Sequence, residues 1–382
     1  MENDFDEIRP YDDEELPQIF EELIADPAFR KIVADVFKGV PFDAIAAQMR
    51  VCKTKFEFQT AFCYSFLKKI MQEATLGVDI DLSSLTDRSA SYTYISNHRD
   101  IVLDSGFLSL LLVESGLDTV EIAIGDNLLI YPWIKKLVRI NKSFIVQRAL
   151  SMRQMLESSA RLSSYMHYAV NEKHQSVWIA QREGRAKDSD DRTQESILKM
   201  MTMAGEGDIV SRLKDLHIVP LSISYEYDPC DYLKAQEFQM KRDDPEFKKS
   251  TSDDLKNMET GLFGFKGHVH FQVADCIDGE LDALAGCNSK PELYSCIAAL
   301  IDRKIHAGYR LYPNNYVAHD LLTGEQAFTA HYTAEDKQHF VQYLEARLSK
   351  IELPVKDDDF LRTKMLQMYA NPLTNHLAAI HD

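Results

Sequence analysis

Residues 96–104 decide how the central part of this chain is organised, and they read Ser96-Asn97-His98-Arg99-Asp100-Ile101-Val102-Leu103-Asp104. The alternating segment before them, residues 92–95, predicts a strand, and the apolar run at 107–113 predicts a helix. His98 therefore lies at a strand-to-helix turn with two aspartates close behind it. A carboxylate that orients a histidine and stabilises its protonated form makes that histidine a general base. Either aspartate suits this role, and Asp100 can instead cap the helix.

The composition is that of a globular protein and excludes some partners. The 382 residues are 45% hydrophobic and 27% charged, which allows more than one domain. The formal net charge of -17 argues against nucleic-acid binding and against attraction of the whole molecule to anionic lipid. The acidic N-terminus, residues 1–22, predicts a mobile, solvated tail over roughly its first ten residues.

The cysteines and the hydropathy predict a reducing compartment. None of the six cysteines forms a C-x-x-C pair or a zinc set with nearby histidines, so we expect reduced thiols, no metal and no bound cofactor. No run of about 18 apolar residues predicts a membrane-spanning helix, and no secretion signal is evident. We expect a cytoplasmic protein, peripherally associated with the inner face of the membrane.

Strands and helices alternate through the middle of the chain. Helical periodicity predicts a helical domain within residues 1–85, and residues 77–87 predict a linker. Within residues 86–290, strands are expected near 92–95, 120–124, 143–146, 176–180, 217–226 and 267–273. A long helix is expected at 149–171 and an exposed, charged helical segment at 234–256. Buried strands that alternate with helices predict an α/β fold, with a mixed, mostly parallel central sheet flanked by helices. Residues 291–382 are expected to be a mostly helical C-terminal extension.

One amphipathic helix after Pro132 reverses the charge of this acidic protein. It carries Trp133, Lys135, Lys136 and Arg139 with no acidic residue between them. One interpretation is an ordinary solvated helix face. The other is a surface for an anionic partner such as a phosphate, lipid headgroups or an acidic carrier protein, and a tryptophan beside cations also suits a membrane interface.

Charged residues also follow two further predicted strands. Arg148 comes after the strand at 143–146, where a guanidinium can hold a phosphate in a bidentate manner. Glu183-Gly184, with cations on both sides, follows the strand at 176–180 and suits a tight turn. Both segments can equally be ordinary solvated surface. In an α/β fold, the loops at the strand ends would bring His98, Arg148 and Glu183 to one rim.

Four stretches in order, residues 97–104, 142–148, 179–187 and 218–226, resemble the sequence blocks of the glycerolphosphate acyltransferase superfamily, particularly glycerol-3-phosphate and 1-acylglycerol-3-phosphate acyltransferases. The resemblance covers residues 90–275, and the end of the fourth stretch, residues 223–226, is more similar to the glycerol-3-phosphate branch. Two spacings depart from the family pattern. Five residues instead of four separate His98 from Asp104, and Arg185 follows Glu183-Gly184 one residue earlier than usual.

The resemblance implies the glycerolphosphate acyltransferase fold and acyl transfer from acyl-CoA or acyl carrier protein to a hydroxyl of glycerol 3-phosphate, in phospholipid biosynthesis. His98 would be the general base and Asp104 its partner, while Glu183 would orient the acceptor's hydroxyls or hold an arginine. The implied substrate-binding residues are Arg148, Glu183, Gly184, Arg185, Lys187 and Pro220, with the arginines on the phosphate.

Two other functions remain open from the sequence. The same chemistry can act on 1-acylglycerol 3-phosphate (lysophosphatidate) or on another lipid acceptor. A member of another class would bind acyl or phospholipid ligands without catalysis. A hydrolase is disfavoured because no Gly-x-Ser-x-Gly motif is present.

Overall fold

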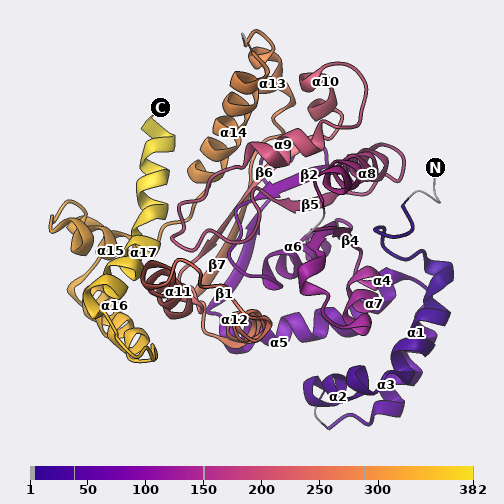
Figure 1. Cartoon of the computed structure of the whole chain (residues 1–382), viewed down its shortest axis with the longest axis horizontal. Helices are drawn as coiled ribbons and strands as arrows, with labels where there is room; N and C mark the ends of the chain where they lie inside the picture. Colours follow the sequence, from indigo (N-terminus) through magenta and orange to yellow (C-terminus); the bar gives the residue numbers. More distant parts are fainter. Residues whose placement is uncertain (1–4, 38, 149–150, 288, 382) are drawn as a thin grey trace.

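The computed structural model describes residues 5–37, 39–148, 151–287 and 289–381. In this part of the chain seven strands form one sheet in the order β1-β7-β6-β2-β5-β3-β4 (Figure 1). The strands are β1 (Gly77–Asp81), β2 (Thr93–Ser96), β3 (Glu121–Gly125), β4 (Ser143–Val146), β5 (Val177–Ala180), β6 (Ile218–Tyr225) and β7 (His268–Val273). Only the β6–β7 pair is antiparallel among these described strands, which confirms the predicted mixed, mostly parallel sheet.

Helices precede, connect and follow the strands. Those before the sheet or within its connections are α1 (Leu16–Ala25), α2 (Pro27–Val36), α3 (Phe42–Val51), α4 (Lys55–Phe58), α5 (Tyr64–Ala74), α6 (Leu103–Glu114), α7 (Pro132–Ile140), α8 (Met152–Asn171), α9 (Glu195–Met201), α10 (Ile209–Lys214), α11 (Asp231–Asp243) and α12 (Thr251–Phe263). Those after the sheet are α13 (Asp278–Leu284), α14 (Lys290–Ala307), α15 (Pro313–Thr323), α16 (Ala334–Leu348) and α17 (Asp358–His381). The helical character predicted for both ends of the chain is confirmed.

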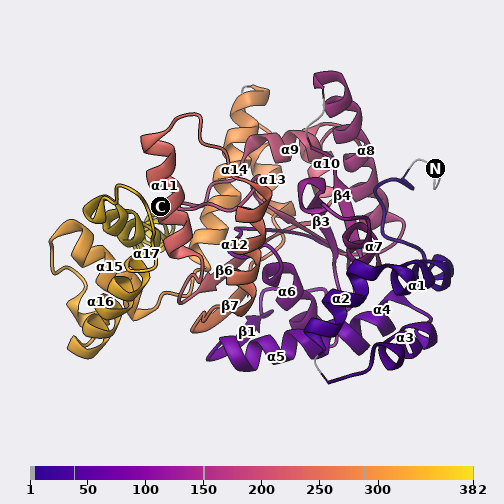
Figure 2. The same cartoon turned by 60° about the horizontal axis from the view of Figure 1, so that its bottom comes forward.

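Helices cover both faces of the sheet, and the strand pattern explains why. Successive side chains of a strand point to opposite faces. Tyr94 and Trp178 pack in one apolar core with α5 and α6, while their neighbours Ile95 and Ile179 pack in a second core with α8, α9 and α14. Figure 2 shows these two helical layers above and below the strands. Strands buried on both sides are typical of parallel sheets, which explains their almost continuous apolar sequences.

Two smaller apolar cores lie beside the sheet. The helices α1 to α3 pack around Phe20 and Phe29, and Ile140 at the end of α7 joins this core. At the other end of the molecule, α15, α16 and α17 pack with α11 (Figure 1). Among the described residues, no helix combines the length and the apolar character needed to cross a bilayer.

The prediction of a linker is wrong for residues 77–81, and the prediction of a mobile tail is wrong for residues 5–10, while residues 1–4 lie outside the described residues. The segment 77–81, expected in a linker, forms β1 and pairs with β7, because the alternating Val78 and Ile80 pack against the core. Residues 5–10 of the expected tail are packed onto the protein. Phe5 lies 5.3 Å from the ring of Tyr165, and the carbonyl of Ile8 accepts a hydrogen bond from the Ile145 N–H at 2.9 Å.

The charged segment 234–256 also differs from its prediction. It forms parts of α11 and α12, but α11 is not an exposed helix. Lys234, Glu237 and Gln239 are buried, because α17 packs on α11 and other segments supply their partners. Lys234 pairs with Asp228, Glu237 with Lys187, and Gln239 with the backbone of Val355 and Asp357. The predicted long helix at 149–171 is α8, which begins at Met152, and Ala149 lies outside the described residues.

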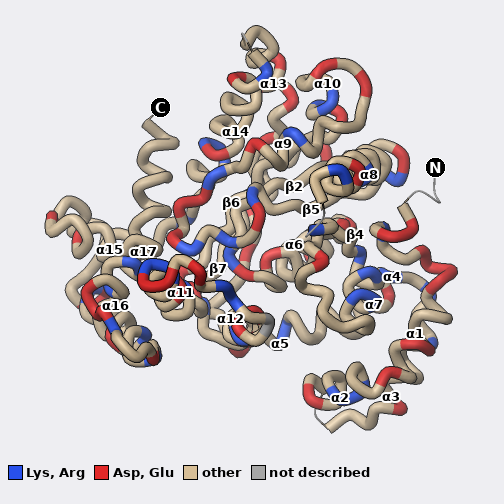
Figure 3. The backbone as a smooth tube through the Cα atoms, in the orientation of Figure 1, with Lys and Arg blue, Asp and Glu red and all other residues tan. Residues whose placement is uncertain are grey.

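The cations of α7, interpreted from the sequence either as a solvated face or as a surface for an anionic partner, differ in exposure. Arg139 is buried, donates hydrogen bonds to the carbonyls of Arg9 and Asp6 at 2.7 and 2.8 Å, and stacks on the ring of Tyr11. Lys136 forms an ion pair of 2.8 Å with Glu22, and Figure 3 shows acidic positions of α1 beside the basic positions of α7. Of the predicted cations, Lys135 is exposed. The amphipathic pattern predicted the helix correctly, but it did not show that N-terminal residues cover part of its basic face.

Candidate active site

The His98 turn places a histidine and a buried aspartate in direct contact. The Nδ1 atom of His98 lies 2.8 Å from Oδ2 of Asp104, which is fully buried in the first turn of α6. The same oxygen accepts hydrogen bonds from the backbone N–H groups of Arg99 at 2.6 Å and Asp100 at 3.0 Å. Three donors on one carboxylate oxygen fix its position, so Asp104 sets the orientation of the imidazole ring.

Asp100 has a different role. Its Oδ1 accepts hydrogen bonds from the N–H groups of Val102 at 2.9 Å and Leu103 at 2.8 Å, at the start of α6. Burial, together with the nearby charge of Asp104, raises the pKa of Asp100. Gly261 of α12 approaches so closely that a Cβ there would overlap Oδ2 of Asp100. Of the two aspartates considered from the sequence, Asp104 is therefore the partner of His98 and Asp100 is the helix cap.

His98 opens onto a large cavity. The cavity has a volume of about 950 Å³ and lies beyond the ends of β2, β3 and β5. Its apolar wall includes Phe66 and Leu67 of α5, Trp133 and Leu137 of α7, and Leu262 of α12. Its polar wall contains the residues His98, Arg148, Glu183, Gly184, Arg185 and Lys187. The structure thus brings six of the eight predicted site residues to one cavity.

The other two predicted residues lie behind or away from the cavity lining. Asp104 is buried behind His98. Pro220 is buried within β6, where it pairs with Ile95 of β2 and its carbonyl accepts a hydrogen bond from Ala274. Pro220 is not one of the described residues that line the cavity. The structure places Pro220 in the sheet instead of at a substrate surface.

Arg148 is held in the cavity wall by two features. Its Nη1 lies 3.1 Å from Oε1 of Glu183, whose side chain is largely exposed. Its guanidinium also rests against Gly125, where a Cβ would lie 2.8 Å from Nε and 2.9 Å from Cζ of Arg148. Glu183 precedes Gly184, which has a φ of 67°, a value that glycine adopts without strain. Of the two roles considered for Glu183, holding an arginine matches this geometry.

The next two cations differ in how fully they are paired. Arg185 is near Asn257, with an Nη2–Oδ1 distance of 3.4 Å, and its buried Nη1 has no hydrogen-bond partner among the described residues. Lys187 forms an ion pair with Glu237 of α11. Burial lowers the pKa of Lys187 to about 8, although this ion pair acts in the opposite direction. The buried Nη1 of Arg185 can donate a hydrogen bond to an anionic ligand, and the Lys187 ammonium can do the same while it is protonated.

Several residues that support the His98 turn were not singled out from the sequence. The buried Arg99 lies 2.7 Å from Oδ2 of Asp191, which also accepts a hydrogen bond from the Tyr309 hydroxyl at 2.6 Å. Trp178 packs edge-on against the His98 ring, with 5.7 Å between centroids. Arg99 is visible in the sequence within the motif, and Trp178 lies in a predicted strand. The contact of Asp191 with Tyr309 spans 118 residues and has no local signal.

Tyr225, at the end of β6, lies beside the two aspartates. Burial and the charges of Asp104 and Asp100 raise its pKa well above the ordinary value, so its hydroxyl stays protonated. The Tyr225 hydroxyl and Oδ1 of Asp104 both lack a geometrically acceptable hydrogen bond among the described residues. The tyrosine therefore closes the buried side of the site with a neutral group.

Comparison with known proteins gives a family for this region. Residues 80–224 match the model of the Acyltransferase family. The 1-acyl-sn-glycerophosphate (LPA) acyltransferase PlsC from Thermotoga maritima aligns with 77% of this chain and 94% of its own length, at 11% identity and a TM-score of 0.37. That similarity is too low to support an inference about substrate. No curated protein sequence matches the chain. The matched residues 80–224 contain the His98–Asp104 pair, and the match agrees with the resemblance to glycerolphosphate acyltransferases seen in the sequence.

Proposed function

We propose that the protein transfers a fatty acyl group from an acyl thioester, carried by coenzyme A or acyl carrier protein, to a hydroxyl of glycerol 3-phosphate. The observation that carries the proposal is the 2.8 Å contact between Nδ1 of His98 and Asp104, which leaves Nε2 as the nitrogen free for chemistry. His98 shares its cavity with Arg148, Arg185 and Lys187. A base beside three cations suits an acceptor that carries both a hydroxyl and a phosphate.

In the proposed reaction, Nε2 of His98 takes the proton of the acceptor hydroxyl as its oxygen attacks the thioester carbonyl carbon. Asp104 stabilises the imidazolium that forms. The tetrahedral intermediate then breaks its carbon–sulfur bond, and the thiolate leaves with the proton that His98 returns. No acyl-enzyme is needed, because the acceptor itself is the nucleophile. General-base catalysis of this kind contributes roughly 10²–10⁴-fold to the rate, and positioning both substrates contributes a further share.

The cavity offers distinct surroundings for the two substrates. The phosphate of the acceptor would contact Arg148 and Arg185, whose fork-shaped guanidinium groups match phosphate oxygens, with Lys187 close to them. The acyl chain would lie against the apolar wall formed by α5, α7 and α12, because burying its methylene groups is favourable. We also propose that the protein binds the membrane surface peripherally. Of the three α7 cations considered for this contact, Lys135 is the exposed one.

A two-acceptor assay tests this function. The purified chain is incubated with long-chain acyl-CoA or acyl carrier protein thioesters and with labelled glycerol 3-phosphate or labelled 1-acylglycerol 3-phosphate, with and without phospholipid vesicles. We expect label from glycerol 3-phosphate to appear in 1-acylglycerol 3-phosphate. Label moving only from the second acceptor would keep the chemistry and change the substrate. A folded protein that consumes no thioester with either acceptor would contradict the proposal and favour a lipid-binding protein.

A further inference from the structure

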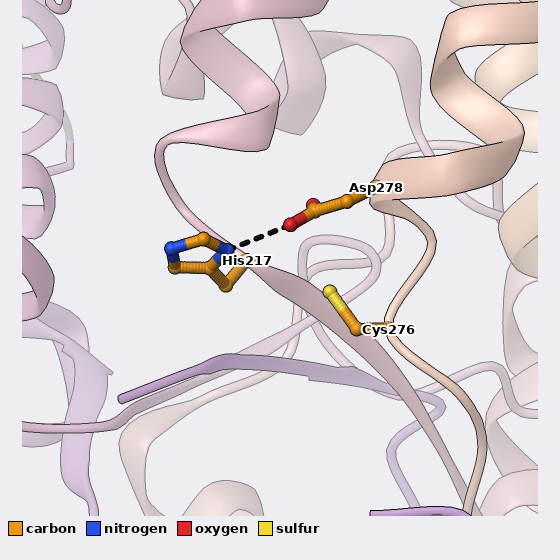
Figure 4. A group of neighbouring side chains, drawn as sticks. All are labelled: His217, Cys276 and Asp278. Atoms are coloured by element: carbon orange, nitrogen blue, oxygen red, sulfur yellow. Dashed lines mark hydrogen bonds and ion pairs between the residues drawn. The ribbon is translucent and has the colours of Figure 1, made fainter. Parts of the chain in front are cut away.

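A second group of reactive side chains lies outside the cavity, where β6 begins and β7 ends. His217 immediately precedes β6, and Cys276 and Asp278 lie in the turn between β7 and α13 (Figure 4). The three side chains point toward one another, and their ligand atoms all lie within 4.8 Å of one another. The Nδ1 atom of His217 is 2.7 Å from Oδ2 of Asp278. No spacing in the sequence revealed this group, because His217 and Cys276 are distant along the chain.

We propose that His217, Cys276 and Asp278 form a zinc-binding site. Imidazole nitrogen, thiolate sulfur and carboxylate oxygen are the three donor types that zinc takes in proteins. Zinc–ligand bonds of about 2.0–2.3 Å in a tetrahedron separate the donor atoms by roughly 3.4–3.6 Å. His217 and Asp278, whose ligand atoms now lie 2.7 Å apart, would therefore separate slightly, which is a shift that side-chain rotation supplies. This site runs against the expectation, drawn from the sequence, that the protein contains no metal-binding set.

The backbone already holds these three residues in place. Ile277 lies between Cys276 and Asp278 in the chain, and its N–H donates to the carbonyl of Ile218 at 3.0 Å. The carbonyl of His217 accepts a hydrogen bond from the N–H of Thr93 in β2 at 3.2 Å. The N–H of His217 donates to the carbonyl of Lys214 at 3.0 Å. The site therefore needs little backbone ordering when the ion binds, which favours affinity.

Asp278 also has unused capacity for an ion. Its second oxygen, Oδ1, is buried and has no hydrogen-bond partner among the described residues. A buried carboxylate oxygen without a partner is costly, and a cation would remove that cost. The side chain of His217 is 45% exposed and that of Asp278 is 27% exposed, which leaves a path for the ion and room for water in the fourth position.

The zinc site would be separate from acyl transfer. His98 follows the carboxyl end of β2, whereas His217 precedes the amino end of β6, and these two strands are parallel neighbours. The two sites therefore lie beyond opposite ends of these strands. A zinc ion here would join the start of β6 to the turn after β7, and we expect it to stabilise the fold without contacting substrate.

A cobalt titration of the full, metal-free chain tests the site. Cobalt(II) replaces zinc and gives an intense near-ultraviolet charge-transfer band only when a thiolate binds it. We expect one equivalent of cobalt to produce this band, zinc to abolish it, and Cys276→Ser to lose it. His217→Ala is expected to weaken metal binding at least about tenfold, since even outer contacts of metal sites are worth that much. Zinc should also raise the melting temperature of the wild type but not of Cys276→Ser.

A matched control separates this site from chance binding by other thiols. Cys287 lies close enough to Cys296 to interact with it, so Cys287→Ser tests the alternative thiolate pair. The proposal requires this variant to keep the band. A wild type without a band at one equivalent would overturn it, as would a band that persists in Cys276→Ser or disappears in Cys287→Ser. If Cys276→Ser fails to fold by circular dichroism, Asp278→Asn replaces it, and unchanged metal affinity in Asp278→Asn and His217→Ala would be equally decisive against the site.

Discussion

Replacing Asp104 with asparagine keeps the shape of the side chain and removes its charge. In the proposed reaction, His98 becomes an imidazolium beside this carboxylate. Charge centres that share a 2.8 Å hydrogen bond lie roughly 4 Å apart, and at an effective dielectric constant of about 20 they attract each other by about 4 kcal/mol. That stabilisation exists in the transition state but not while the ring is neutral. Losing it lowers kcat by about 10³-fold, because each 1.36 kcal/mol corresponds to a factor of about ten.

The asparagine amide adds a second effect. Its NH₂ group can donate to Nδ1 and favour the tautomer that carries the proton on Nε2, which cannot act as a base there. We therefore expect a fall in kcat of about 10³–10⁴-fold, with little change in the KM for the acceptor. The assay follows release of free thiol from the acyl thioester at saturating acceptor, and circular dichroism confirms that the variant folds.

Asp100→Asn is the matched control, since it neutralises the neighbouring carboxylate that caps α6. This variant should leave most of kcat, because the asparagine oxygen can still accept the two hydrogen bonds at the start of α6. A folded Asp104→Asn variant with nearly wild-type kcat would refute the reasoning. So would a loss in Asp100→Asn that equals the loss in Asp104→Asn.

Three further predictions concern the cations of the cavity. Arg148→Ala should raise the KM for glycerol 3-phosphate about 10- to 150-fold with little change in kcat, because a charge-assisted hydrogen bond is worth about 1.5–3 kcal/mol; an unchanged KM would remove Arg148 from the phosphate site. Gly125→Ala should raise the same KM by a smaller factor, because its new Cβ would push the Arg148 guanidinium from the wall; an unaffected KM would show that this wall contact is unimportant. Since burial lowers the pKa of Lys187 to about 8, its charged fraction falls from about nine-tenths at pH 7 to about one-tenth at pH 9. Acceptor KM should therefore rise across this range in the wild type and not in Lys187→Arg, whereas a rise that persists in Lys187→Arg would contradict this role of Lys187.

Six of the seven described strands and the His98–Asp104 pair were predictable because they rest on local patterns. Period-two alternation and apolar runs located the strands near 92–95 and 143–146, and the helical run at 107–113 located α6. The aspartate that follows His98 by six positions lies in the first turn of α6, and there its side chain reaches back to Nδ1.

Other features depend on which surfaces meet, and a single sequence does not contain that information. Arg139 shows the problem, because its amphipathic helix suggested an exposed cationic face, yet the N-terminal segment covers it. The Asp191–Tyr309 contact behind Arg99 and the approach of Gly261 to Asp100 likewise arise from long-range packing. Their positions follow from the tertiary fold and not from spacing along the chain.

The central claim is that His98 acts as the base of an acyl transfer to glycerol 3-phosphate. The most direct test compares the wild type with His98→Ala, by the rate at which label from glycerol 3-phosphate enters 1-acylglycerol 3-phosphate with a long-chain acyl thioester as donor. The proposed mechanism predicts product from the wild type and a fall of roughly 10²–10⁴-fold in the folded variant. A folded His98→Ala variant that forms product at close to the wild-type rate would contradict the mechanism.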